Sequence, residues 1–69
     1  MTTSENLIKI RKMLCLNQSE FARALGITPP AISRYETGNR EPSYSTVRKI
    51  IALAKAHNLT INFEDIRAE

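Results

Sequence analysis

Apolar residues recur at helical spacing from the start of the chain. Leu7, Ile10 and Leu14 fall on one face of a helix, and Ser4 is a residue type that caps helix starts. The pattern therefore predicts an amphipathic helix over residues 4–14, with its apolar face toward a core.

A second, shorter helix is indicated after residue 17. Asn17 followed three residues later by Glu20 is typical of a capping box, in which each residue satisfies a backbone amide of the other. Gly26 ends this helix, because the residue after a helix often adopts the left-handed conformation that glycine tolerates. Its apolar face carries Phe21, Ala22 and Leu25.

Thr28 predicts the start of another short helix. Pro29 and Pro30 follow this N-cap residue, at positions where the missing amides would have no partner within the helix. Ile32 and Tyr35 point inward, and the helix stops near residues 37–38, before a loop over residues 39–42.

Ser43 predicts the cap of a longer helix that runs to about His57. Its buried stripe is expected to carry Val47, Ile50, Ile51 and Ala54. Residues 59–66 are ambiguous: the alternation from Leu59 to Phe63 favours a strand, while Asn62 before an acidic turn favours a short capped helix. We expect the short helix.

The two central helices and their tight turn form the feature most suggestive of function. A helix–turn–helix can present its second helix outward, where its first residues fit the major groove of DNA. Here Ser33 and Arg34 lie on the flank away from Ile32 and Tyr35. Unrelated helical hairpins share this pattern, so the residues alone leave DNA binding and simple packing open.

Composition and charge narrow the classes of protein. A chain of 69 residues is one small domain, with little room for an enzyme cleft beside its core. Cys15 and His57 are single residues of their kinds, so neither a disulfide nor a zinc site is expected, and no cofactor is implied. No apolar run is long enough for a membrane span and the first residues lack a signal-peptide core, so a cytoplasmic protein is expected.

The distribution of charge suits a polyanionic partner. The net charge is +3 and the isoelectric point about 9.4. Residues 1–58 carry nine Lys and Arg against four acids, whereas residues 59–69 carry three acids against one Arg. This excess is weak support for nucleic-acid binding, because many small basic proteins bind none.

Several motifs, in order and spacing, resemble the Cro and phage-repressor helix-turn-helix family, also called XRE-type. They are LIKIR (7–11), LNQSEFA (16–22), LGIT (25–28), ISRYETG (32–38) and PS (42–43). The resemblance covers about residues 6–60. It implies an all-α, five-helix, lambda-repressor-like domain over residues 1–69. It also implies a homodimer on a pseudo-palindromic double-stranded DNA operator, with residues 61–69 as a tail that could contact the dimer mate.

The same resemblance implies roles for individual residues. The base-reading positions are Thr28, Pro29, Pro30, Ser33 and Arg34, with Ser33 the more marginal. Phage repressors often have glutamines where this chain has the two prolines. Prolines offer only apolar surface, suited to thymine methyl groups, which leaves Arg34 as the main hydrogen-bonding reader of guanine.

Further positions are implied to contact phosphates or to brace the fold. The phosphate-binding positions are Asn17, Gln18, Arg23, Gly38, Asn39 and Arg40. Gln18 is also implied to brace the recognition helix. Arg11 and Glu36 match a structural ion pair between the first helix and the end of the recognition helix. Cys15 replaces a glycine common in the family and is expected to be a partly buried filler.

The sequence leaves two functions open. The first is a transcriptional repressor that covers promoter DNA. The second is an antitoxin-type module that binds a toxin or another protein and also regulates its own operon, with the apolar tail as a protein contact. An enzyme is disfavoured, since the sequence holds no nucleophile–base set, metal motif or phosphate loop.

Overall fold

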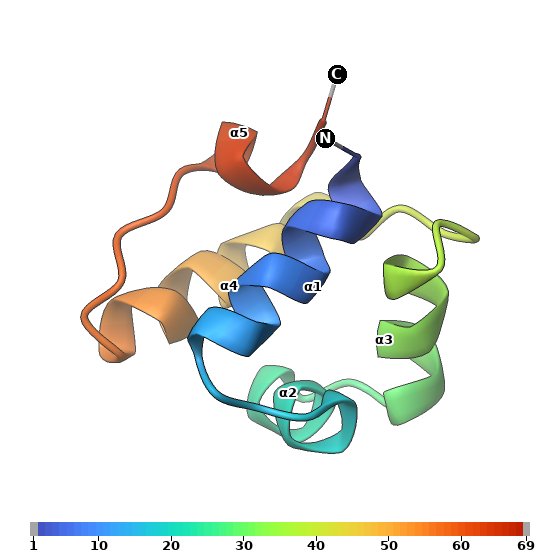
Figure 1. The fold of residues 1–69 in the computed structure, drawn as a ribbon, viewed down its shortest axis with the longest axis horizontal. Helices are drawn as coiled ribbons and strands as arrows, with labels where there is room; N and C mark the ends of the chain where they lie inside the picture. Colours follow the sequence, from blue (N-terminus) through green and yellow to red (C-terminus); the bar gives the residue numbers. More distant parts are fainter. Residues whose placement is uncertain (1, 69) are drawn as a thin grey trace.

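Residues 2–68 are described by the computed structural model, and they form five α-helices without a strand (Figure 1). The helices are α1 (Thr3–Met13), α2 (Gln18–Leu25), α3 (Pro29–Glu36), α4 (Tyr44–Ala56) and α5 (Phe63–Ile66). The predicted all-α class is confirmed. The tail is the short helix that we expected, and the strand alternative is wrong for it.

The helices surround one core. α3 packs against α1 and α2, α2 against α4, and the short α5 covers α1 and α4 near both chain ends (Figure 1). The predicted apolar faces are buried, except that Ile51 is half-buried and Thr46 takes its place inside. The core consists of Leu7, Ile10, Leu14, Phe21, Ala22, Leu25, Ile32, Tyr35, Val47, Ile50 and Ile66.

The first helix begins one residue earlier than the sequence predicted. Thr2, not Ser4, is its N-cap: the Thr2 hydroxyl accepts from the Glu5 amide at 3.2 Å, and the Glu5 carboxylate accepts from the Thr2 amide at 2.8 Å. A cap at Ser4 would put Leu7 at the third helical position, where no carboxylate could complete the box. The hydrogen bond from the Thr2 amide lowers the pKa of Glu5.

The turn after α1 corrects the expectation for Cys15. Its side chain is exposed, and its φ of 60° lies in the left-handed region. The amide of Leu16 donates to the Arg11 carbonyl at 3.2 Å across this turn, which requires the left-handed residue between them. Cys15 therefore fills no space in the core, and the half-buried Leu16 packs there instead.

The ends of α4 agree with the sequence. The Ser43 hydroxyl accepts from the Thr46 amide at 3.2 Å, and His57 is the C-cap residue, with Nδ1 3.0 Å from the Leu53 carbonyl oxygen. Charge on an imidazole at this end of a helix is mildly favourable.

Hydrogen bonds tie the two ends of the chain together. The Ala68 amide donates to the Thr3 hydroxyl at 2.9 Å, and the Asn6 side chain donates to the Ile66 carbonyl at 3.1 Å. Arg67 reaches the Pro42 carbonyl at 3.1 Å. Over residues 2–68 no helix has both the length and the apolar character that crossing a membrane requires.

Candidate nucleic-acid interface

A short, rigid turn joins α2 to α3. Gly26 caps α2 with a φ of 71°, and the amide of Ile27 donates to the Ala22 carbonyl at 3.0 Å. Ile27 is half-buried and packs against the core. Thr28 then caps α3, since its hydroxyl accepts from the Ala31 amide at 3.4 Å. The turn therefore fixes the direction in which α3 leaves α2.

One side of α3 is held in the core and the other faces out. Ile32, Tyr35 and Glu36 are buried. At 100° per residue, Pro30 and Arg34 lie opposite these residues, only about 40° apart, and both are exposed. Of the other predicted base-reading residues, Thr28 and Pro29 are exposed at the start of the helix, and Ser33 is half-buried on its flank.

The first residues of α3 offer few backbone N–H groups to a ligand. Pro29 and Pro30 have no amide hydrogen, and the next amide, that of Ala31, is directed to Thr28. The start of α3 thus presents proline and alanine carbons. The exposed polar side chains on this side include those of Thr28 at the start and of Arg34, six residues later.

A buried carboxylate braces α3 against the two preceding helices. The Glu36 oxygens accept from Arg11 Nε at 2.8 Å, from Arg11 Nη2 at 3.2 Å and from Gln18 Nε2 at 3.1 Å. The Glu36 side chain is only 4% exposed, and that of Arg11 is 16% exposed. A carboxylate this buried needs such charge-assisted partners. We call Arg11, Gln18 and Glu36 the brace.

The structure gives Gln18 the bracing role that the family resemblance implied and identifies its partner. The pairing of Arg11 with Glu36 also matched a family pattern, whereas nothing local in the sequence indicates that Gln18 binds the same carboxylate, 18 residues later. The side-chain amide of Gln18 donates one of its two hydrogens to this carboxylate. Its other hydrogen and its side-chain oxygen remain for solvent or a ligand.

The segment after α3 differs from the expectation in one respect. The backbone amides of Gly38, Asn39 and Arg40 donate to carbonyls within the chain, at 3.3 Å to Tyr35 and at 3.0 and 3.3 Å to Arg34. Those amides are therefore not free to bind a phosphate in this conformation. The exposed side chains of Asn39 and Arg40 are the groups that stay available.

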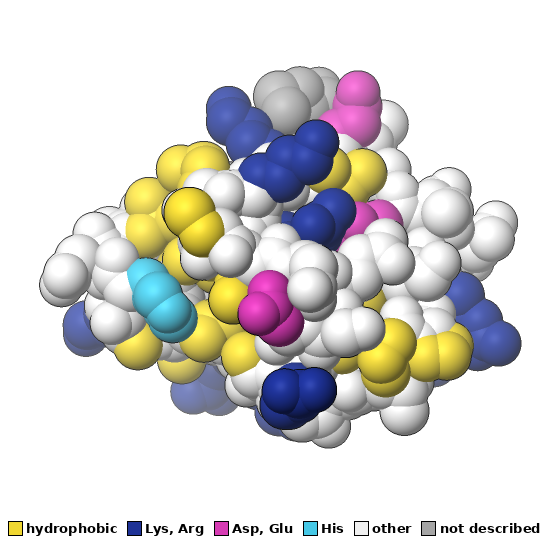
Figure 2. All heavy atoms as spheres, turned by 60° about the horizontal axis from the view of Figure 1, so that its bottom comes forward, with side chains coloured by type: hydrophobic (Ala, Val, Ile, Leu, Met, Phe, Trp, Pro, Cys, Tyr) yellow, Lys and Arg dark blue, Asp and Glu magenta, His cyan; other side chains and the backbone are white. Residues whose placement is uncertain are grey.

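The remaining predicted phosphate contacts lie on α2. Asn17 is the N-cap, and its side-chain oxygen accepts from the Glu20 amide at 2.7 Å. Its side-chain NH₂ is left as the free donor. Arg23 is exposed in the last turn of α2. Figure 2 shows Lys and Arg side chains at many places on the face that includes the bottom of Figure 1, with few acidic side chains among them.

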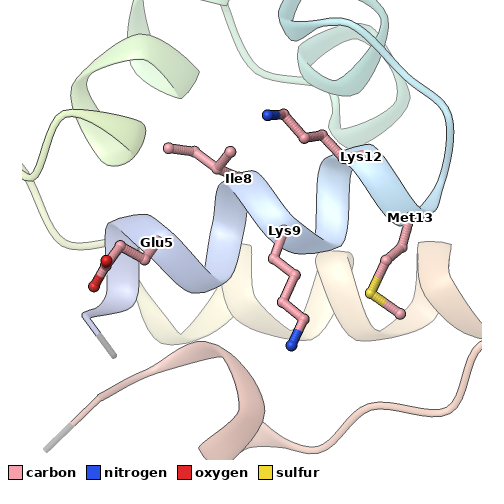
Figure 3. A pocket seen from close by; sticks show the side chains of 5 residues that line it. All are labelled: Glu5, Ile8, Lys9, Lys12 and Met13. Atoms are coloured by element: carbon pink, nitrogen blue, oxygen red, sulfur yellow. The ribbon is translucent and has the colours of Figure 1, made fainter.

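Shallow hollows lie on the surface of the described residues. One lies on the outer side of α1, and all its lining residues come from that helix: Glu5, Ile8, Lys9, Lys12 and Met13. Their side chains diverge along the helix, with Lys9 and Lys12 extending to opposite sides (Figure 3). Over residues 2–68 no three His, Cys, Asp or Glu side chains come together as metal ligands.

An aromatic cluster on the side formed by α4 and α5 was not predicted from the sequence. The rings of Tyr44 and Phe63 lie with their centroids 5.4 Å apart, and the Arg48 guanidinium sits 5.9 Å from the centre of the Tyr44 ring. Tyr44 is 61% exposed, which is unusual for a large side chain with apolar neighbours. The signal available from the sequence was an aromatic residue directly after the Ser43 cap.

Comparisons with known proteins agree with this geometry. A family model described as helix-turn-helix matches residues 7–62. YqaE of Bacillus subtilis, described as an uncharacterized HTH-type transcriptional regulator, is 53% identical over 47 residues, which cover 68% of this chain and 40% of YqaE. No solved structure matches this chain.

Two further relatives differ in description. An uncharacterized HTH-type transcriptional regulator of Archaeoglobus fulgidus is 41% identical over 49 residues, covering 71% of this chain and 21% of the relative. The antitoxin MqsA of Escherichia coli is 41% identical over 51 residues, covering 74% of this chain and 39% of MqsA. The matches thus span well under half the length of each of these relatives.

Proposed function

The chain belongs to the XRE-type helix-turn-helix family, and from this premise we propose that it binds double-stranded DNA in a sequence-specific way and regulates transcription as a repressor. The observation that carries the proposal is the outward side of α3. Its exposed residues include Pro30 and Arg34, while the brace and the core hold its opposite side. A fixed helix with an exposed face of this kind fits the major groove.

In this proposal Arg34 supplies the base-specific hydrogen bonds. A guanidinium can donate two parallel bonds to O6 and N7 of guanine, which is worth about 1–3 kcal/mol of discrimination against other bases. Thr28, Pro29 and Pro30 approach the neighbouring bases, where the prolines contact thymine methyl groups. Ser33 lies at the edge of this contact.

Phosphate contacts flank the recognition helix on both sides. Asn17, Gln18 and Arg23 on α2 would meet one stretch of backbone, and the side chains of Asn39 and Arg40 another. Such contacts position the protein but do not read sequence, and they make binding sensitive to salt.

We further propose a homodimer on a pseudo-palindromic operator. The molecule measures 29 × 26 × 20 Å, so two copies side by side have a repeat comparable to the roughly 34–36 Å between half-sites one helical turn apart. An apolar surface on α4 and the tail, which we call the α4–tail strip, is available for the contact. It consists of Tyr44, Arg48, Ile51, Lys55, Leu59, Ile61 and Phe63.

The charges around the α4–tail strip suit pairing with a second copy. Arg48 and Lys55 lie within the strip, and the acidic Glu64 and Asp65 directly follow its Phe63 in the sequence, on α5. In a two-fold symmetric contact the same patch faces itself, so the acids of one copy can meet the bases of the other.

Two arginine variants test the DNA-binding role. Arg34→Ala is expected to relax base preference at one position of each half-site and to weaken binding to the preferred site by about 1–3 kcal/mol. Arg40→Ala is expected to weaken all sequences alike and to reduce the salt dependence of log K by about one unit of slope. Fluorescence anisotropy at several salt concentrations measures both effects.

Lys9→Ala is the matched control, because it removes the same charge from an exposed position on α1. It should leave base preference unchanged. An Arg34→Ala protein with the affinity and base preference of the unmodified chain would rule out Arg34 as the reader.

A second function is favoured by one relative, the antitoxin MqsA. In that case the chain would also bind a small toxin protein, and the α4–tail strip would be covered by that protein in place of a second copy. Co-expression with the product of a neighbouring gene, followed by size-exclusion chromatography, tests this reading. A stable complex that still binds the operator supports it, and separate elution contradicts it.

A further inference from the structure

Pro30 and Arg34 form one line along the outside of α3. They are four residues apart, so they lie about 40° apart around the helix and about 6 Å apart along it. Both side chains are exposed, and Thr37 continues the same side one turn nearer the end. Stacked base pairs repeat every 3.4 Å or so, which puts neighbouring base pairs within reach of these two side chains.

Pro30 can recognise a base only by apolar contact. It has no amide hydrogen and no polar side-chain atom, and the amide of the following residue, Ala31, is already directed to the Thr28 hydroxyl and carbonyl at 3.4 and 3.0 Å. The apolar group that a standard base pair shows in the major groove is the C5 methyl of thymine.

The same contact cannot distinguish thymine from 5-methylcytosine. Both pyrimidines carry a methyl group at C5, and they differ in the major groove at position 4, where thymine has an acceptor oxygen and cytosine a donor amino group. A glutamine or asparagine would sense that difference, whereas the proline ring has neither donor nor acceptor. Unmethylated cytosine offers the ring no methyl group to cover.

We infer that Pro30 and Arg34 read two neighbouring base pairs together, a guanine through Arg34 and a C5-methylated pyrimidine through Pro30. Thymine and 5-methylcytosine both satisfy the second position. Methylation of cytosine at C5 in the operator therefore strengthens binding. This inference rests on the proposed DNA-binding function and adds to it the class of base at one position and a chemical mark to which the site responds.

The test uses the preferred operator found by random-oligonucleotide selection. Four probes differ at the pyrimidine next to the guanine that depends on Arg34: thymine, uracil, 5-methylcytosine and cytosine. The thymine–uracil pair and the 5-methylcytosine–cytosine pair each differ by one methyl group and nothing else. Removing the methyl is expected to raise Kd about fourfold in one half-site and roughly fifteenfold in both, by the usual scale of methyl burial.

Two variants locate the effect on the helix. Pro30→Gln is expected to abolish the difference within both probe pairs, because the apolar ring is gone. Lys9→Gln is the control, since it puts the same residue at an exposed position of α1 outside the proposed DNA contacts and should preserve the differences. Circular dichroism verifies that each variant keeps its helical content.

The possible results distinguish a failure of the methyl contact from a failure of the proposed DNA-binding function. Equal Kd values within both probe pairs, together with an operator that the selection had found, would overturn the methyl contact and leave the DNA-binding role standing. The same would follow if Pro30→Gln kept the differences that the unmodified chain shows. If no operator emerges and binding is equal for all sequences, the proposed function fails first, and the inference with it.

Discussion

Glu36 joins α3 to the two helices before it. It is the last residue of α3, and its carboxylate contacts Arg11 of α1 and Gln18 of α2. Arg11 also donates to the Leu16 carbonyl at 3.0 Å, so the brace reaches the turn before α2 as well. One buried carboxylate therefore sets the position of three helices relative to one another.

Replacing Glu36 with glutamine should destabilise the fold strongly. Glu36→Gln keeps the size of the side chain but leaves the guanidinium of Arg11 without its counter-charge in a nearly buried position. Removing one partner of a buried pair typically costs about 3–5 kcal/mol, and the partial exposure of Arg11 favours the lower end of that range. Urea unfolding followed by circular dichroism measures the loss.

The control for this change is Glu64→Gln, which removes the same charge from an exposed position on α5. It should change the free energy of unfolding by well under about 1 kcal/mol. If the two variants were equally stable, the buried pair would contribute no more than a surface charge, and the bracing role of Glu36 would be wrong.

The sequence predicts local features such as helix caps, but it does not by itself predict the contacts between distant residues that form the brace. A helix face or an N-cap is encoded by residues three or four positions apart, so the cap at Asn17 was visible in the chain. The contacts of Glu36 join residues 18 and 25 positions apart, and only the family resemblance pointed to them. It paired Glu36 with Arg11 and gave Gln18 a bracing role, but it did not identify the carboxylate that Gln18 contacts.

Among the turns that follow helices, two with a left-handed residue, after α1 and after α2, contrast most clearly. Gly26 ends α2 with a φ of 71°, and a Cβ atom added there would meet no atom within 4 Å. Cys15 follows α1 with a φ of 60° and is exposed. The sequence predicted the first turn because glycine marks it, and it missed the second because a β-carbon in this conformation is disfavoured.

Exchanging these residue types should move stability in opposite directions. Gly26→Ala is expected to cost about 1 kcal/mol through backbone strain alone, since space for the methyl group is available. Cys15→Gly is expected to stabilise the fold by about 0.5 kcal/mol, because the relief of strain exceeds the greater flexibility of glycine in the unfolded chain.

Urea unfolding in the presence of a reducing agent compares these variants with the unmodified chain. Cys15→Ala serves as the control, since it removes the thiol but keeps the β-carbon, and it should lie close to the starting stability. A Cys15→Gly protein no more stable than Cys15→Ala would contradict the strain at this turn.

In the molecule as a whole, the order of the helices could be predicted from the sequence, whereas the contacts between the two ends of the chain could not. Each amphipathic stripe is a local pattern, which is why four helices were found within a residue or two. The burial of Ile66 depends on α1 and α4, and the bond from Asn6 to its carbonyl spans 60 residues. The sequence of residues 59–66, taken alone, was compatible with a strand as well as with a helix.

The proposed homodimer makes Tyr44 a sensitive position. Tyr44→Glu puts a charge at the edge of the α4–tail strip, where its exposed side chain contributes little to folding. We expect Kd for a palindrome with both half-sites to rise at least about tenfold, with unchanged Kd for a single half-site, because cooperation between the copies is lost. Anisotropy titrations on the two probes measure this.

Met13→Glu is the matched control, since within residues 2–68 Met13 is the other large apolar residue with high exposure, at 52%, and it lies on α1. It should leave both affinities unchanged. If it weakened the palindrome and Tyr44→Glu did not, the contact between copies would lie on α1 and not on the α4–tail strip.

In the proposed function the outward side of α3 reads DNA sequence, and Arg34 donates the hydrogen bonds to a base. Selection from random double-stranded oligonucleotides, run in parallel with the unmodified chain and with Arg34→Ala, tests this role. We expect a two-fold symmetric consensus for the unmodified chain and loss of preference at one guanine per half-site for the variant. Identical consensus sequences for both proteins, or no enrichment for the unmodified chain, would contradict it.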